Sequence, residues 1–118
     1  MTNGMTFLAG IDDLPLRTGR AFRPWSYSVS HRCLVLRTWE DDTKPALELE
    51  FKNVLAMKLR RSFDPLHVSE VVDGVPEIDE FADISDEDRE FFRTLLLSGG
   101  THQGFVVCSR MQLVPRWG

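Results

Sequence analysis

Apolar and polar residues alternate with a period of two in the centre of the chain. The alternation is clearest over residues 46–52, where leucine and phenylalanine alternate with charged side chains, and over 25–29, where aromatic and β-branched residues alternate with serine. A period of two is typical of a strand with one face against a core. We therefore expect extended segments over 25–39 and 46–59, joined by the polar loop 40–45.

Each extended segment is long for one strand, so each is expected to contain a turn or bulge. Ser30-His31-Arg32 interrupts the first, and Lys52-Asn53 interrupts the second. Further strands are expected over 66–72, which ends at the turn dipeptide Asp73-Gly74, and over 105–114. Glu48 and Glu50 fall on the outward positions and are expected to form a solvated strand face.

Residues 83–100 fit two patterns. Ser85 with Asp88 approximates a capping box, and the apolar residues that follow suit a short helix over 85–97. The segment 92–97, followed by Ser98-Gly99-Gly100 and then by 104–108, also suits a β-hairpin. The pattern leaves open whether 91–97 is a helix or a strand.

These patterns predict one mostly β domain. We expect about six antiparallel strands in a sandwich or partly open barrel, with at most one short helix near 85–97, because helices and strands do not alternate as in a parallel sheet. An α+β fold is the alternative. At 118 residues, with 42% apolar and 27% charged residues, the chain has the composition of a single globular domain. Glycine and proline break every pattern in residues 1–23, which are expected to be irregular.

Charge is distributed unevenly along the chain. Residues 73–90 contain nine acidic residues and one base, Arg89, for a net charge of −8, so the rest of the chain carries +4 of the total of −4. We expect 73–90 to be an acidic loop. Such asymmetry is typical of an interaction surface, although it also occurs in solvated loops.

This asymmetry leads to the principal functional hypothesis, a non-enzymatic binding or regulatory module that recognises a basic protein partner. Small acidic antitoxin and immunity-type proteins have a similar composition, because opposite charge speeds the capture of a basic protein. The residues predicted to contact the partner are Asp83, Asp86, Glu87, Asp88 and Trp39. A homodimer joined through an edge strand fits the sequence as well.

The alternative comes from another functional class, a small-molecule-binding β-barrel or a minor enzyme. Its pocket is predicted to be lined by Trp25, Tyr27, His31 and Arg37. Two tests separate the hypotheses. Neutralising the acidic residues should weaken partner binding but leave a ligand pocket intact, and thermal-shift screening detects ligands of such a pocket.

Other classes are disfavoured by the sequence. It contains no phosphate-binding loop, dinucleotide fingerprint, nucleophile elbow or paired metal-ligand motif, so we predict no cofactor, no metal and no catalytic residues. A pI near 5.3 disfavours nucleic acid as the main partner. The apolar runs are too short to span a bilayer and the N-terminus does not resemble a signal peptide, so we expect a cytoplasmic protein with reduced cysteines.

Overall fold

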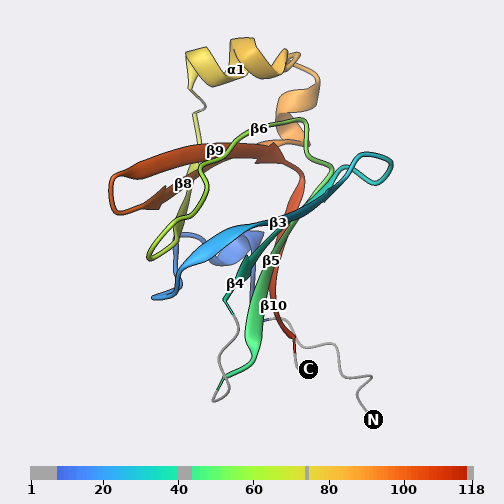
Figure 1. The fold of residues 1–118 in the computed structure, drawn as a ribbon. Coiled ribbons are helices and arrows are strands. Elements are labelled where there is room, and N and C mark those ends of the chain that lie inside the picture. Colours follow the sequence, from blue (N-terminus) through green and yellow to red (C-terminus); the bar gives the residue numbers. More distant parts are fainter. Residues whose placement is uncertain (1–7, 40–43, 74, 117–118) are drawn as a thin grey trace.

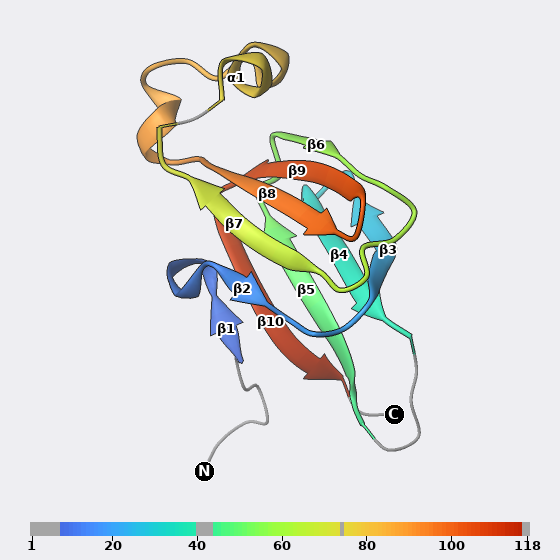
Figure 2. The same cartoon turned by 90° about the vertical axis from the view of Figure 1, so that its left-hand side faces the viewer.

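Two antiparallel sheets pack face to face in the computed structural model, which describes residues 8–39, 44–73 and 75–116 (Figure 1). Sheet A has the strand order β1 (Ala9–Gly10), β10 (Arg110–Arg116), β5 (Ala46–Lys52), β4 (Cys33–Thr38) and β3 (Phe22–Ser28). Sheet B has the order β2 (Leu16–Arg17), β7 (His67–Val71), β8 (Arg93–Gly99), β9 (His102–Cys108) and β6 (Ala56–Lys58). The long strands cross in separate layers (Figure 2).

The core lies between the sheets and follows directly from the alternation within each strand. In β5, Leu49 and Phe51 point inward and are fully buried, beside Leu36 and Leu34 of β4. Sheet B contributes its own buried side chains to the same cluster. They include Val68, Leu95, Leu97, Val106 and Cys108. Burial of these side chains is the main stabilising contribution that the sequence pattern encodes.

The prediction of a mostly β domain with one short helix is confirmed, and the structure contains two antiparallel sheets with no closed barrel among its described residues. The chain is a single compact domain. Within the described ranges, no helix is long and apolar enough to cross a membrane.

The position of the helix differs from the prediction. The helix α1 is Pro76–Ala82, whereas the predicted segment 85–97 contains a 3-10 turn, η2 (Asp88–Glu90), and then strand β8. Pro76 suits the first helical turn, where no hydrogen-bond donor is needed. Of the segment 91–97, residues 93–97 belong to strand β8, because β8 lies between β7 and β9 and forms hydrogen bonds on both sides. Gly100, with a φ of 60°, makes the tight turn into β9.

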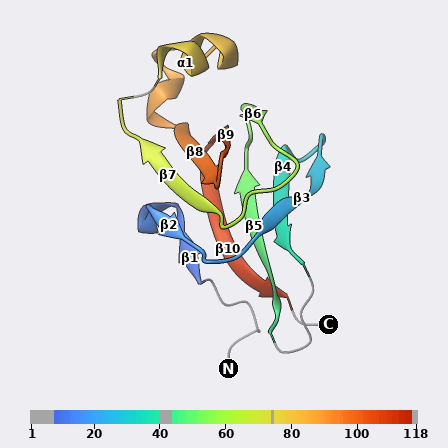
Figure 3. The same cartoon turned by 60° about the vertical axis from the view of Figure 1, so that its left-hand side comes forward.

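Two segments predicted to be irregular contain short elements. Residues 1–23 include β1, a 3-10 turn η1 (Ile11–Asp13), β2 and the start of β3 among the residues described. The acidic segment 73–90 contains α1 and η2 rather than a continuous loop. This segment leaves sheet B after β7 and returns at β8, so it lies at one end of the molecule (Figures 2 and 3).

Candidate binding surfaces

The acidic segment presents most of its charge to solvent. Arg89, its only base, donates to Asp79 at 2.9 Å and pairs with Asp86 at 3.4 Å. The Asp79 carboxylate raises the pKa of the Arg89 guanidinium further. The remaining acids predicted to bind a partner, Asp83, Glu87 and Asp88, are exposed and form no ion pair within the described part of the chain. This end of the molecule is therefore strongly and openly negative.

An apolar groove lies between α1 and the outer face of sheet B, and Glu77 is the carboxylate on its lining. It encloses about 650 Å³. Its lining is Met57, Lys58, Glu77, Ile78, Phe81, Leu96, Gln103, Gly104 and Phe105. Ile78 is buried against the sheet, whereas Phe81 is 69% exposed and meets the ring of Phe105 edge-on, at 5.9 Å between ring centroids. The groove thus has an aromatic wall that is open to solvent.

A smaller polar pocket of about 300 Å³ lies under α1, where β7 ends and β8 begins. Its charged lining residues are Glu70, Asp73, Asp79, Arg89, Glu90 and Arg93. One Asp79 oxygen accepts the hydrogen bond from Arg89, while the other is buried without a partner in the residues that the structure describes. The pocket adds negative charge to the same end of the molecule.

Trp39 lies apart from the four acidic residues with which it was predicted to act. It directly follows β4, whose end points away from α1 and toward the opposite end of the molecule (Figure 1). There it contacts the guanidinium of Arg23, at 4.7 Å from the ring centroid. The predicted partner-binding residues are therefore divided between two surfaces.

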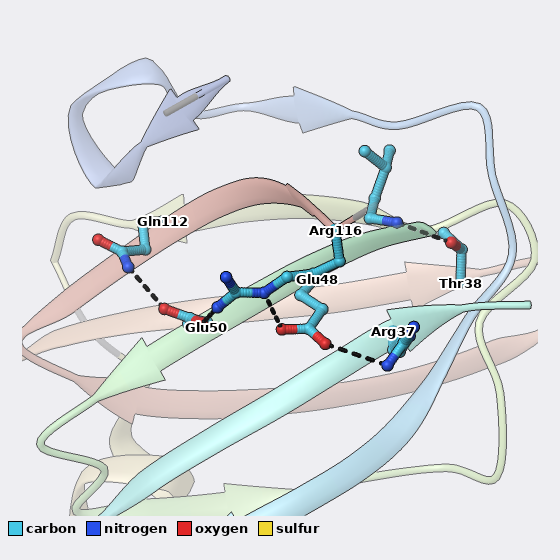
Figure 4. A network of polar contacts seen from close by, with 7 residues as sticks. Arg37, Thr38, Glu48, Glu50, Gln112 and Arg116 are labelled. Atoms are coloured by element: carbon cyan, nitrogen blue, oxygen red, sulfur yellow. Dashed lines mark hydrogen bonds and ion pairs between the residues drawn. The ribbon is translucent and has the colours of Figure 1, made fainter. Parts of the chain in front are cut away.

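The outer face of sheet A contains a connected set of ion pairs (Figure 4). Glu48 binds Arg37 at 3.4 Å and Arg116 at 2.8 Å, and Arg116 also binds Glu50 at 3.0 Å. Gln112 donates a further hydrogen bond to Glu50. Glu48 is only 9% exposed, so the expectation of a fully solvated carboxylate row is wrong. Arginines from β4 and β10 cover the carboxylates, and a pattern within one strand does not reveal that pairing.

Aromatic rings extend this set toward the edge of the sheet. Arg37 lies over Trp25 at 4.8 Å, and Arg23 contacts Trp25 at 5.2 Å as well as Trp39. Stacked guanidinium and indole groups attract each other and hold each other in place. Trp25 and Trp39 nevertheless remain about half exposed.

The four residues of the predicted small-molecule pocket are only partly brought together. Trp25 and Arg37 are in contact on the outer face of sheet A. Tyr27 pairs in register with the buried Leu34 and therefore lies on the opposite face of the sheet. His31 lies in the β3–β4 turn and lines a separate hollow. The bulge between Pro24 and Ser26 shifts the alternation that placed Trp25 and Tyr27 together in the sequence.

Both cysteines are free thiols, and their surroundings differ. Burial raises the pKa of Cys108 to about 12, against 9.0 for an ordinary thiol. Partial burial, followed by the nearby Glu50 carboxylate, also raises the pKa of Cys33. Neither thiol is therefore activated as a nucleophile. In the described ranges, no group of three or more His, Cys, Asp or Glu residues is arranged to hold a metal ion.

The predicted homodimer requires an edge strand that is free to pair with the same strand of a second copy. Strand β3, at one edge of sheet A, contains Pro24 and a bulge, and β6, at one edge of sheet B, has three residues. Proline, bulges and short strands all hinder edge-to-edge pairing. A homodimer through strand pairing stays a prediction that these edges do not favour.

No protein family, curated protein or solved structure compared with this chain is similar to it. Its function is therefore inferred from its own surfaces. The apolar groove was not anticipated, because the sequence interpretation treated 73–90 as a loop. The signal was present, since Ile78, Phe81 and Ala82 have the spacing of one helical face.

Proposed function

We propose that this chain is a non-enzymatic binding module that recognises a basic amphipathic segment of a protein partner at its α1 end. The observation that carries the proposal is the open apolar groove beside α1, which has Glu77 on its lining and is followed along the chain by a segment of exposed carboxylates. An amphipathic helix with a basic polar face complements both features at once. Its apolar side chains fill the groove, and its lysines or arginines face the acids.

Phe81 supplies the principal apolar anchor. Large aromatic side chains near the centre of an interface contribute much of the binding free energy, and Phe81 already lies against Phe105 in a fixed orientation. Because the ring is exposed in the free protein, a partner that covers it removes apolar surface from water. The remainder of the groove floor is apolar too, through Met57 and Leu96.

The acidic residues contribute in a different way. Exposed charges are screened by salt and change the rate of encounter more than the final affinity. Asp83, Asp86, Glu87 and Asp88 therefore attract and orient a basic segment, while the groove holds it. This division makes a testable distinction, because the two contributions respond differently to salt.

The test uses two designed amphipathic peptides with the same leucine face, one with lysines and one with glutamates on the polar face. Amide chemical shifts of the ¹⁵N-labelled protein are followed during titration at low and moderate salt. We expect the lysine peptide to bind, with shifts concentrated on α1, β6 and β9, and to weaken as salt rises. Equal binding of both peptides, or shifts confined to sheet A, would overturn the proposal.

Variants separate the two contributions. Phe81→Ala should weaken the lysine peptide about tenfold at both salt concentrations, as expected for loss of an aromatic anchor. Val29→Ala, which truncates an exposed apolar residue in the β3–β4 turn, is the matched control and should bind normally. Combined amide substitution of Asp83, Asp86, Glu87 and Asp88 should weaken binding mainly at low salt. Wild-type affinity of that variant at low salt would exclude a role for the acids.

A further inference from the structure

A second surface with opposite charge lies on the outer face of sheet A, beside the β3–β4 turn. It is a shallow hollow of about 650 Å³. Its lining is Ser26, Ser28, His31, Cys33, Val35, Lys52, Asn53 and Arg110. The hollow is separate from the α1 groove, which lies against the outer face of sheet B, and the two share no residue.

The hollow combines two cations with no lining carboxylate. Lys52 of β5 and Arg110 of β10 are directly paired in register, so their side chains lie next to each other on one face. Neither forms an ion pair with any residue in the described ranges. The neighbouring carboxylate, Glu50, is already bound to Arg116 and Gln112. Two adjacent like charges without a counterion are unfavourable, and an anion between them removes the repulsion.

Further polar side chains line the hollow beside the two cations. Ser26 and Ser28 of β3 contribute hydroxyl groups, and His31 of the β3–β4 turn also lines the hollow. Cys33 contributes a thiol that stays protonated at neutral pH, because its burial and Glu50 raise its pKa. No group on this lining carries negative charge at neutral pH, which favours an anionic ligand.

Backbone and side-chain hydrogen bonds connect the strands and the turn that form the hollow. The Val54 amide donates to the Arg32 carbonyl at 2.9 Å, which joins the β3–β4 turn to the end of β5. The Asn53 side-chain amide donates to the Ser109 hydroxyl at 2.7 Å, and the Ser109 amide donates to the Lys52 carbonyl at 3.1 Å. A preformed site loses less conformational freedom on binding than a mobile one.

We propose that this hollow binds the phosphate group of a small phosphate ester. Lys52 and Arg110 bind the phosphate oxygens, and Arg110 is suited to a two-pronged contact. The serine hydroxyls donate to the remaining oxygen. An ester is proposed because the volume of the hollow falls in the range of small-molecule pockets and is larger than one phosphate group would fill. Val35 provides an apolar contact for the organic part.

The first experiment titrates the ¹⁵N-labelled protein with phenyl phosphate and with inorganic phosphate, at an ionic strength held constant with chloride. We expect phenyl phosphate to bind more tightly and to shift amides of residues 26–33, 52–53 and 110. Equal affinity for phenyl phosphate and inorganic phosphate would contradict the proposal that the ligand is an ester. Shifts of amides elsewhere would contradict the proposed location of the site. Lys52→Gln with Arg110→Gln should lower the affinity at least tenfold. Arg60→Gln with Arg61→Gln removes the same charge from exposed positions outside both proposed sites and should leave the affinity unchanged.

The second experiment uses Cys33 as a reporter and does not depend on the double variant. Cys33 lines the hollow and is partly accessible, whereas Cys108 is fully buried, so iodoacetamide should modify Cys33 first. Bound phenyl phosphate covers the hollow and should slow this reaction several-fold. An unchanged rate at a concentration that saturates the chemical shifts would contradict the proposal. If phenyl phosphate slowed the alkylation of Cys33 equally in the Lys52→Gln, Arg110→Gln protein, the protection would come from another site and the proposal would be wrong.

Discussion

The outer faces of the two sheets differ in polarity and in how much of each face is exposed to solvent. On sheet A the outward side chains of β5 are charged, and its carboxylates are paired with arginines of the neighbouring strands β4 and β10. On sheet B the outward side chains Leu96, Phe105 and Val107 are apolar, and α1 covers part of them with Ile78 and Ala82. One face meets water through paired charges, and the other is partly buried by a helix.

This difference explains where the two proposed sites lie. A helix of seven residues is too short to cover the whole apolar face of sheet B, so a groove with an exposed phenylalanine remains beside it. Sheet A needs no cover, and its hollow forms where the ion pairs end and two cations remain unpaired. Binding at the first site is driven by apolar burial, and binding at the second by charge.

The largest expected loss of stability is for a variant that loosens the packing of α1 on sheet B. Ile78→Ala removes a buried side chain from the small cluster under the helix and should lower the free energy of unfolding by about 2–3 kcal/mol. Chemical denaturation measures this loss. Because so short a helix is not stable alone, amide exchange in 76–82 should also accelerate.

Phe81→Ala is the control for that prediction, since it truncates an exposed residue of the same helix. It removes the edge contact with Phe105 but leaves no buried cavity, so it should lower stability by less than Ile78→Ala does, by about 0.5–1 kcal/mol. If both variants were equally stable, α1 would not be held by the cluster, and the contrast between the two outer faces would fail.

A smaller effect is expected from breaking the ion pairs on sheet A. Glu48→Ala leaves Arg37 and Arg116 without their shared carboxylate and should cost about 1–3 kcal/mol. The value lies below that for a fully buried pair because Arg116 is partly exposed. Glu87→Ala, at an exposed position, is the matched control and should be nearly neutral. Denaturation of the two variants at low and high salt gives both values.

The smallest effect on stability at neutral pH is expected from the cysteines. Cys108 lies in the interior and Cys33 on the outer face of sheet A, so the pair contrasts the two environments. Below pH 9.0 Cys108 is protonated in both the folded and the unfolded chain, so it contributes no pH dependence. Above that value the unfolded thiol ionises while the buried one does not until about 12, so stability falls by about 1.4 kcal/mol per pH unit.

Denaturation between neutral and alkaline pH measures this slope. Cys108→Ala should remove the fall assigned to the thiol and flatten the curve above pH 9.0. Cys33→Ala should flatten it less, because Cys33 is only partly buried. An identical alkaline slope in the Cys108→Ala protein and the unaltered protein would show that Cys108 is not buried as described.

The sequence alone determined the class of the fold, because alternation within a strand is a local property. The pattern of β5 predicts a half-buried strand, and Leu49, Glu50 and Phe51 occupy the expected faces. The charge asymmetry of 73–90 is likewise a property of the sequence, and the structure leaves that charge exposed.

Tertiary structure decided what depends on partners distant in the chain. The run Leu95–Leu97 is apolar on both faces because Leu95 and Leu97 meet the core while Leu96 packs in the cluster under α1. Such a run has no period that separates strand from helix. Pairing with β7 and β9 made it a strand. The bulge in β3 placed Trp25 beside Arg37 and left Tyr27 on the other face. Strand pairing and register are set by contacts across the whole chain, and no local pattern contains them.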